Sequence, residues 1–211
     1  MDNQNVTPPF IIYSLGRSRT AWLSAFLTYG DWRCYHEISS RLRSFEDIKK
    51  LLSIPKIGIL ETAAIPARPL IKYACPGIRE LIIIRPLEEV IESYLATDTA
   101  GLVTWDTKKL RSVLSREYRE LEKLSSSVLT IEYKDIATEE GCKKIFEHCL
   151  PYTFDKEWWE IGKDQNIQID MKAFFQYYLE NRDEIENFKK QLKCDLRRFR
   201  KNGEILNEVR T

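Results

Sequence analysis

Residues 10–27 read FIIYSLGRSRTAWLSAFL, and this stretch changes character twice along its length. It opens as an apolar run, breaks at residues 14–16, continues as a polar turn and ends in apolar residues at helical spacing. We therefore expect a strand, a loop and a helix in direct succession. In that arrangement the loop amides and the first helical N–H groups point outward, unpaired, at the positive end of the helix dipole. Such a loop is a physical site for a phosphate or a sulfate.

The polar turn carries two arginines, Arg17 and Arg19. Their forked, permanently charged donors suit tetrahedral oxyanions. The alternative is an ordinary strand–loop–helix unit with solvated arginines, and this stretch alone fits both interpretations equally well. The ATP-binding form of the loop, GxxxxGK[ST], is absent, since no second glycine follows and no lysine precedes Ser18 or Thr20. The loop therefore does not indicate a standard nucleoside triphosphatase.

The composition is that of a soluble globular protein. The 211 residues are 43% hydrophobic and 31% charged, which is enough to bury a sizeable core, so we expect a single domain over residues 1–211. The formal net charge of +1 gives no overall attraction to nucleic acid or to an anionic membrane. The five cysteines are widely spaced without a CxxC pair, which favours reduced thiols over disulfides or a zinc site. No secretory signal opens the sequence and no apolar run reaches membrane-spanning length, so we expect a cytoplasmic protein without a metal centre.

Apolar strand patterns alternate with helical patterns along the chain. The expected strands lie at residues 10–13, 31–37, 57–60, 81–84 and 128–131, and the expected helices at residues 22–27, 41–52, 66–74, 86–94, 106–124, 139–149 and from 155 onward. This alternation predicts an α/β protein: a central parallel sheet with helices on both faces, in a three-layer α/β/α sandwich. The uninterrupted run LIII at residues 81–84 is typical of a central parallel strand. Residues 181–211 are strongly charged, and we expect a solvated helical tail there.

Ligands of such sheets bind beyond the carboxyl ends of the strands. That rule gathers the polar residues that follow the expected strands: residues 17–20, His36, Glu37, Glu61, Thr62, Arg85 and Tyr133. We expect these side chains to lie along one edge of the sheet.

Three segments together resemble the sulfotransferase family that uses 3′-phosphoadenosine 5′-phosphosulfate (PAPS). The family's first motif, the P-loop-like turn P-K-S-G-T-T-W with arginine often in the lysine place, is similar to GRSRTAW at residues 16–22. The second, an apolar strand followed by arginine and a serine eight residues on, is similar to the pair Arg85 and Ser93. The third, a strand ending in Tyr-Glu-Asp-Leu before an amphipathic helix, is similar to IEYKDI at residues 131–136. The three occur in the family's order across about residues 10–150, and they imply a P-loop-like sulfotransferase fold.

The resemblance implies a role for each matched residue. The loop residues would hold the 5′-phosphosulfate of PAPS through backbone and side chain: Arg17, Ser18, Arg19, Thr20 and Ala21. Arg85 and Ser93 would hold the 3′-phosphate, and Tyr133 would lie near the adenine. On residues alone, the alternatives are a salt bridge from Arg85 to Glu89, an ordinary surface serine at Ser93 and core packing of Tyr133.

The sequence departs from the family pattern in three places. Arg19 replaces the motif glycine, and if that position needs a positive φ, an arginine there costs on the order of 1 kcal/mol. Ala21 replaces a threonine, which removes one hydroxyl contact. The family's later glycine-rich segment near the 3′-phosphate is not evident, since Gly203 stands alone.

Transfer to a hydroxyl or amine acceptor, with 3′,5′-adenosine bisphosphate as the leaving group, resembles phosphoryl transfer. Arg17 and the loop amides would stabilise the leaving oxygen, and a base would take the acceptor's proton. We expect Glu37 as the base, because residues 33–37, RCYHE, resemble the strand and glutamate of the family's protein-tyrosine branch. His36 is the second candidate, by similarity to the cytosolic branch, and Glu61 is the third. The alternative is a surface or capping role for His36 and a helix-start role for Glu37.

Two other classes remain open. One is a nucleotide-binding protein of the same fold that has lost transfer, a class that Arg19 and Ala21 favour. The other is a kinase-like P-loop enzyme, against which the absence of a Walker lysine speaks. The acceptor stays unidentified, since residues 39–55 and 97–107, which would shape its pocket, carry no diagnostic pattern.

Overall fold

The computed structural model describes residues 7–62, 64–97, 103–167 and 170–202. The described chain is an α/β fold built on five strands that all run parallel, in the order β2-β3-β1-β4-β5. The strands are β1 (Phe10–Ser14), β2 (Arg33–His36), β3 (Ile57–Glu61), β4 (Arg79–Ile84) and β5 (Leu129–Glu132). Each expected strand is therefore present, with ends that differ by one or two residues at most positions.

β1 lies at the centre of the sheet. It pairs with β3, placing Ile11 opposite Ile59, and with β4, placing Tyr13 opposite Ile82. All five residues of β1 are buried. A strand covered on both faces needs apolar residues in succession, which explains the uninterrupted run at its start. Because β1 is central, the loop that leaves its carboxyl end opens at the middle of the sheet edge.

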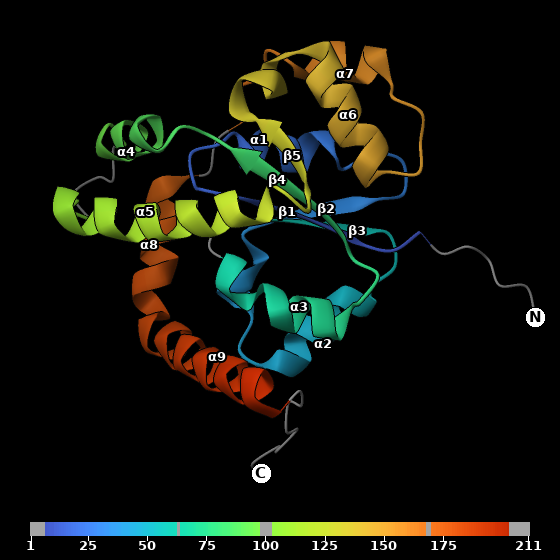
Figure 1. Cartoon of the computed structure of the whole chain (residues 1–211). Helices are drawn as coiled ribbons and strands as arrows, with labels where there is room; N and C mark the ends of the chain where they lie inside the picture. The colour runs from blue at the N-terminus through green and yellow to red at the C-terminus, as the bar shows by residue number, and fades with distance from the viewer. Residues whose placement is uncertain (1–6, 63, 98–102, 168–169, 203–211) are drawn as a thin grey trace, which may run out of the picture.

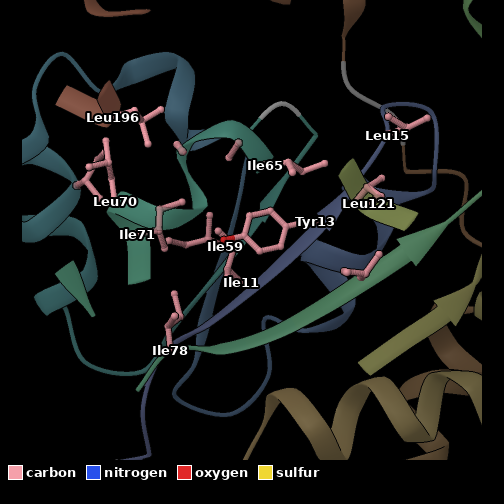
Figure 2. Close-up of a cluster of buried hydrophobic side chains, with 14 of the residues drawn as sticks. Ile11, Tyr13, Leu15, Ile59, Ile65, Leu70, Ile71, Ile78, Leu121 and Leu196 are labelled. Atoms are coloured by element: carbon pink, nitrogen blue, oxygen red, sulfur yellow. The ribbon is translucent and has the colours of Figure 1, made fainter. Parts of the chain in front are cut away.

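Helices pack on both faces of the sheet (Figure 1). One face carries α1 (Thr20–Phe26), α6 (Glu139–Cys149) and α7 (Lys156–Gly162). The other face carries α2 (Phe45–Ser53), α3 (Arg68–Ala74) and α5 (Thr107–Leu124). Alternate residues of β1 serve the two faces: Phe10 and Ile12 pack toward α1 and α6, whereas Ile11 and Tyr13 belong to the cluster drawn in Figure 2.

The remaining helices lie beside these layers. α4 (Leu87–Leu95) contacts α5, α8 (Met171–Glu180) contacts α9 (Arg182–Asn202), and α9 contacts α3. Short 3-10 turns cover Ile38–Arg41, Ile65–Ala67 and Tyr133–Ala137. The expected N-cap of the long helix is confirmed, since the Asp106 carboxylate accepts hydrogen bonds from the amides of Lys108 and Lys109.

The expectation of a solvated C-terminal helix is wrong for the described part of that segment. α9 buries Ile185 and Leu196 and packs Phe188, Leu192 and Phe199 against the core that α2 and α3 share. These residues recur every three or four positions, so they form one apolar stripe among the charges. Figure 2 shows Leu196 beside Leu70. The stripe ties the end of the described chain to the body of the fold.

One glycine of β3 is required by close packing within the sheet. A Cβ added at Gly58 would lie 1.9 Å from the ring of Phe10, which is fully buried on the neighbouring strand. Only a residue without a side chain leaves room for that ring. No helix within the described residues is long and apolar enough to cross a membrane.

Candidate functional site

A cavity of about 600 Å³ opens at the carboxyl edge of the sheet. Its wall takes residues from the carboxyl end of each strand: the loop after β1, His36 at the end of β2 and Glu37 after it, Thr62 after β3, Arg85 after β4 and Tyr133 after β5. Helix α4 adds Ser93 and Tyr94. The volume lies in the range typical of small-molecule sites. The topology of the sheet thus gathers segments from the whole length of the fold around one space.

Every residue that the sequence motifs single out as cofactor-binding or as a first or second candidate base lines this cavity: Arg17, Ser18, Arg19, Thr20, Ala21, His36, Glu37, Arg85, Ser93 and Tyr133. Glu61 is the exception, since it is 2% exposed and lies outside the lining. The structure therefore brings the matched positions together in space, and it places the third candidate base, Glu61, behind the cavity wall and not in it.

The loop between β1 and α1 has an unusual backbone. Arg17 and Arg19 both have left-handed conformations, with φ of 66° and 57°. Non-glycine residues rarely adopt this region, and such strain is common at binding loops. Arg19, which stands where the resembled motif has glycine, therefore lies at a position with positive φ, as considered from the sequence. Gly16 is needed for another reason, because an added Cβ would lie 1.9 Å from the Tyr94 hydroxyl oxygen.

Two arginines from distant segments meet at one side of the cavity. Arg17 Nε donates to Ser93 Oγ at 3.1 Å, and Arg85 Nη1 donates to the backbone carbonyl of Arg17. The Arg85 guanidinium also lies over the Tyr133 ring, 4.2 Å from its centroid. Arg85 makes the ion pair with Glu89 that the structural alternative anticipated, at 3.3 Å, so it has both kinds of contact. The Arg17 guanidinium thus contacts the Ser93 hydroxyl, and the Arg85 guanidinium contacts the backbone of the same loop.

Ser18 stands out inside the loop. Its side chain is fully buried, it lines the cavity, and its hydroxyl has no hydrogen-bond partner among the described residues. An unpaired buried hydroxyl is costly, so it marks a position where a ligand atom can supply the missing bond. The neighbouring Thr20 hydroxyl is already engaged, since a 2.8 Å hydrogen bond joins it to His36 Nε2.

The Arg19 guanidinium makes other contacts than the phosphate contact that the resemblance implies for it. Its Nη2 donates to the backbone carbonyl of Lys163 at 2.9 Å, and its guanidinium lies 4.6 Å from the centroid of the Trp22 ring. Trp22 in turn donates from Nε1 to the carbonyl of Gly162 at 2.8 Å. Both contacts run from the start of α1 to the end of α7, which lies on the same face of the sheet (Figure 1).

Glu37, half-buried in the cavity wall, lies close enough to the buried Glu61 for the two carboxylates to interact electrostatically. The Thr62 hydroxyl donates to Glu37 Oε1, and the Ser39 amide donates to Glu61 Oε1 at 2.8 Å. Burial raises the pKa of Glu37, against the opposing effect of the Thr62 hydrogen bonds. Burial and then the nearby Glu37 charge raise the pKa of Glu61 to about 8. Glu37 also has a left-handed backbone, with φ of 54°.

His36 is held in its neutral form. Burial lowers its pKa to about 4, so the ring carries no charge near neutral pH. The surface role considered for this histidine does not fit its partial burial and its bond to the loop threonine. A neutral imidazole next to Thr20 orients the first residue of α1.

Several residues that line the cavity belong to none of the sequence motifs. They are Tyr94, Trp105, Phe175 and residues 164–167. The Tyr94, Trp105 and Phe175 rings meet edge to face, with centroids 5.2 and 5.8 Å apart. Trp105 falls in the 97–107 segment expected to shape an acceptor pocket, of which residues 98–102 lie outside the described part; none of residues 39–55 lines the cavity. These residues do not directly follow a strand, so the rule that identified the residues at the sheet edge could not find them.

Comparison of the chain with protein-family models and with curated proteins finds no match. Within the described ranges, no group of His, Cys, Asp or Glu side chains is placed to hold a metal ion.

Proposed function

We propose that this chain is a PAPS-dependent sulfotransferase of the P-loop-like sulfotransferase fold, moving a sulfuryl group to a hydroxyl or amine acceptor. The observation that carries the proposal is the joint placement of Arg17, Arg85 and Ser93 beside the strained β1–α1 loop. Neither the loop motif at residues 16–22 nor the pair Arg85 and Ser93 is specific by itself. Their meeting at one cavity fits a ligand with two separate anionic groups, which is what distinguishes this donor from simple nucleotides.

The anion side of the cavity offers the contacts that the donor needs. The Ser18 hydroxyl supplies a buried donor without a partner, and the N–H groups of the first turn of α1 have no intrahelical acceptors. Arg17 lies beside them and would stabilise the negative charge that builds on the leaving oxygen. Tyr133, stacked under Arg85, offers a ring face to the nucleobase.

Glu37 is the proposed base. It lines the same cavity, and its raised pKa brings it closer to neutrality, where a general base is most effective. Glu37 takes the acceptor's proton as the bond from the acceptor to sulfur forms and the bond from sulfur to the 5′-phosphate oxygen breaks. The leaving electron pair stays on 3′,5′-adenosine bisphosphate, on the Arg17 side. We propose a cytoplasmic location for this chemistry, which five cysteines without disulfide bonds would suit.

One observation favours a second function, nucleotide binding without transfer. Arg19 stands in the motif's glycine place and directs its guanidinium to a backbone carbonyl, so one expected contact to the phosphosulfate is missing. In this version of the site, the donor pocket is retained as a nucleotide sensor and Glu37 serves only the fold.

Thermal unfolding with matched nucleotides tests the proposal. At about 100 times Kd, a ligand that binds only the folded state adds about 2.7 kcal/mol, which raises Tm by roughly 5 to 10 °C for a chain of this size. We expect this shift with 3′,5′-adenosine bisphosphate and a smaller one with adenosine 5′-phosphate, which lacks the 3′ group. Equal shifts would refute the roles of Arg85 and Ser93. Transfer from labelled donor then separates the enzyme from the binding protein, and hydrolysis of ATP without a 3′,5′-bisphosphate shift would favour the kinase-like alternative.

A further inference from the structure

We propose that Arg19 is a positioning residue that fastens the end of α7 to the β1–α1 loop and so holds one wall of the cavity in place. The fastening consists of two donors and two consecutive carbonyls: Arg19 Nη2 to Lys163 and Trp22 Nε1 to Gly162, at 2.9 and 2.8 Å. We call these four groups the α1–α7 clasp. The Arg19 guanidinium lies over the Trp22 indole, 4.6 Å from the ring centroid, which keeps both donors in one orientation.

The clasp lies directly before the wall that it holds. Residues 164–167 follow the second carbonyl without a gap, and they line the cavity. They follow α7, which packs on one face of the sheet, and they line the cavity together with Phe175 of α8. Contacts at their amino-terminal end therefore decide how closely this wall approaches the loop.

The backbone explains why the side chain is the important part of Arg19. With φ of 57°, this position suits glycine, which adopts the left-handed region without penalty. Arginine is unfavourable there, and its contribution comes from the charged donor that reaches the Lys163 carbonyl. Replacement by glycine thus has two opposite effects: it relieves the backbone, and it opens the clasp.

Hydrogen exchange measured by mass spectrometry separates these effects in the full chain without ligand. The reporters are the amides of Lys163 and Gln165, which donate to the carbonyls of Trp159 and Gly162. In Arg19→Gly we expect these amides to exchange about ten times faster, the effect of losing one charge-assisted hydrogen bond, while Tm stays equal or rises. Arg19→Lys, which keeps a charged donor, should retain part of the protection.

The matched control is Lys56→Gly. Lys56 also has a left-handed backbone, with φ of 56°, and it lies outside the cavity lining. This variant relieves the same kind of strain, so it should leave the exchange of residues 163–165 unchanged. Unchanged exchange in Arg19→Gly would overturn the clasp. Faster exchange spread equally over the whole chain would also overturn it, because it would indicate general destabilisation.

A second measurement asks whether the wall serves the ligand, and this part rests on the proposed function. Calorimetry with 3′,5′-adenosine bisphosphate should give a Kd about ten times higher for Arg19→Gly than for wild type. If wild type binds no nucleotide, the proposed function fails while the exchange result still decides the clasp. If wild type binds and Arg19→Gly binds equally well, residues 164–167 are not a wall of the site and the second half of the inference is refuted.

Discussion

The buried Glu61 should make the protein less stable as the pH rises, and Glu61→Gln should reduce that dependence. Its carboxyl group is 2% exposed, and burial together with the nearby Glu37 charge raises its pKa from the ordinary 4.5 to about 8. Between these values the folded state binds a proton that the unfolded state has released. Stability therefore falls as the pH rises through this window and the cost is complete above about pH 8.

The magnitude follows from the shift. At 1.36 kcal/mol per pKa unit, the free energy of unfolding should fall by roughly 3 to 4 kcal/mol between about pH 5 and pH 8, relative to the glutamine variant. Glutamine suits the site, because its carbonyl oxygen can accept from the Ser39 amide and its amide can donate to the Ser39 hydroxyl. His36, whose lowered pKa acts with the opposite sign at acid pH, is common to both proteins and cancels in the difference. Glu37 is also present in both proteins, but it interacts with Glu61, so the difference reports the ionisation of Glu61 together with its effect on Glu37.

Urea unfolding of wild type and Glu61→Gln at both pH values measures this difference. The control is Glu147→Gln, at an exposed glutamate of α6, which should follow wild type at both pH values. Parallel changes in wild type and Glu61→Gln would refute the reasoning, since they would mean that Glu61 is ionised in both states near neutral pH. A neutral Glu61 outside the cavity lining is a poor base, so confirmation would also leave Glu37 and His36 as the candidates.

Three further changes test the site and the sheet. Arg17→Ala should raise the Kd for 3′,5′-adenosine bisphosphate by about 100-fold, more than Arg19→Ala does. The reason is that the Arg17 side chain contacts Ser93 of α4, whereas the Arg19 side chain contacts the Lys163 carbonyl directly after α7. Calorimetry giving the reverse order would contradict this assignment. Glu37→Gln should lower the transfer rate by roughly 10²-fold or more with nucleotide binding unchanged, and it should remove the rise of rate with pH that a base of raised pKa gives; a larger loss in His36→Asn would assign the base to the histidine. Gly58→Ala should lower the free energy of unfolding by about 1 to 3 kcal/mol or more, measured by chemical unfolding. The reason is that the added Cβ would lie 1.9 Å from the Phe10 ring of β1. Unchanged stability would show that the Phe10 ring packs less closely against position 58.

The sequence predicted the strands well because each has a local signature. The run at residues 81–84 became part of β4, next to the central strand, and the polar residues after the strands lie around one cavity as the topology rule predicted. Helix starts were less accurate where proline or polar residues leave the pattern ambiguous: the helix expected from residue 41 begins at Phe45, and the one expected from 66 begins at Arg68 after a 3-10 turn. The apolar stripe of α9 had helical spacing in the sequence, but its high charge led to the wrong expectation of a solvated helix.

What the sequence determined by itself was the alternation of strands and helices, the loop after the first strand and the set of charged residues at the sheet edge. Local hydrophobic periodicity and the rules of parallel sheets are enough for these. Only the tertiary structure decided where each side chain points and how it ionises. Arg19 reaches a carbonyl 144 positions away, and Glu61 has its high pKa because it lies in the core beside Glu37. Hydrogen bonds and desolvation of this kind depend on atoms that come together only when the chain has folded, so no stretch of sequence carries them.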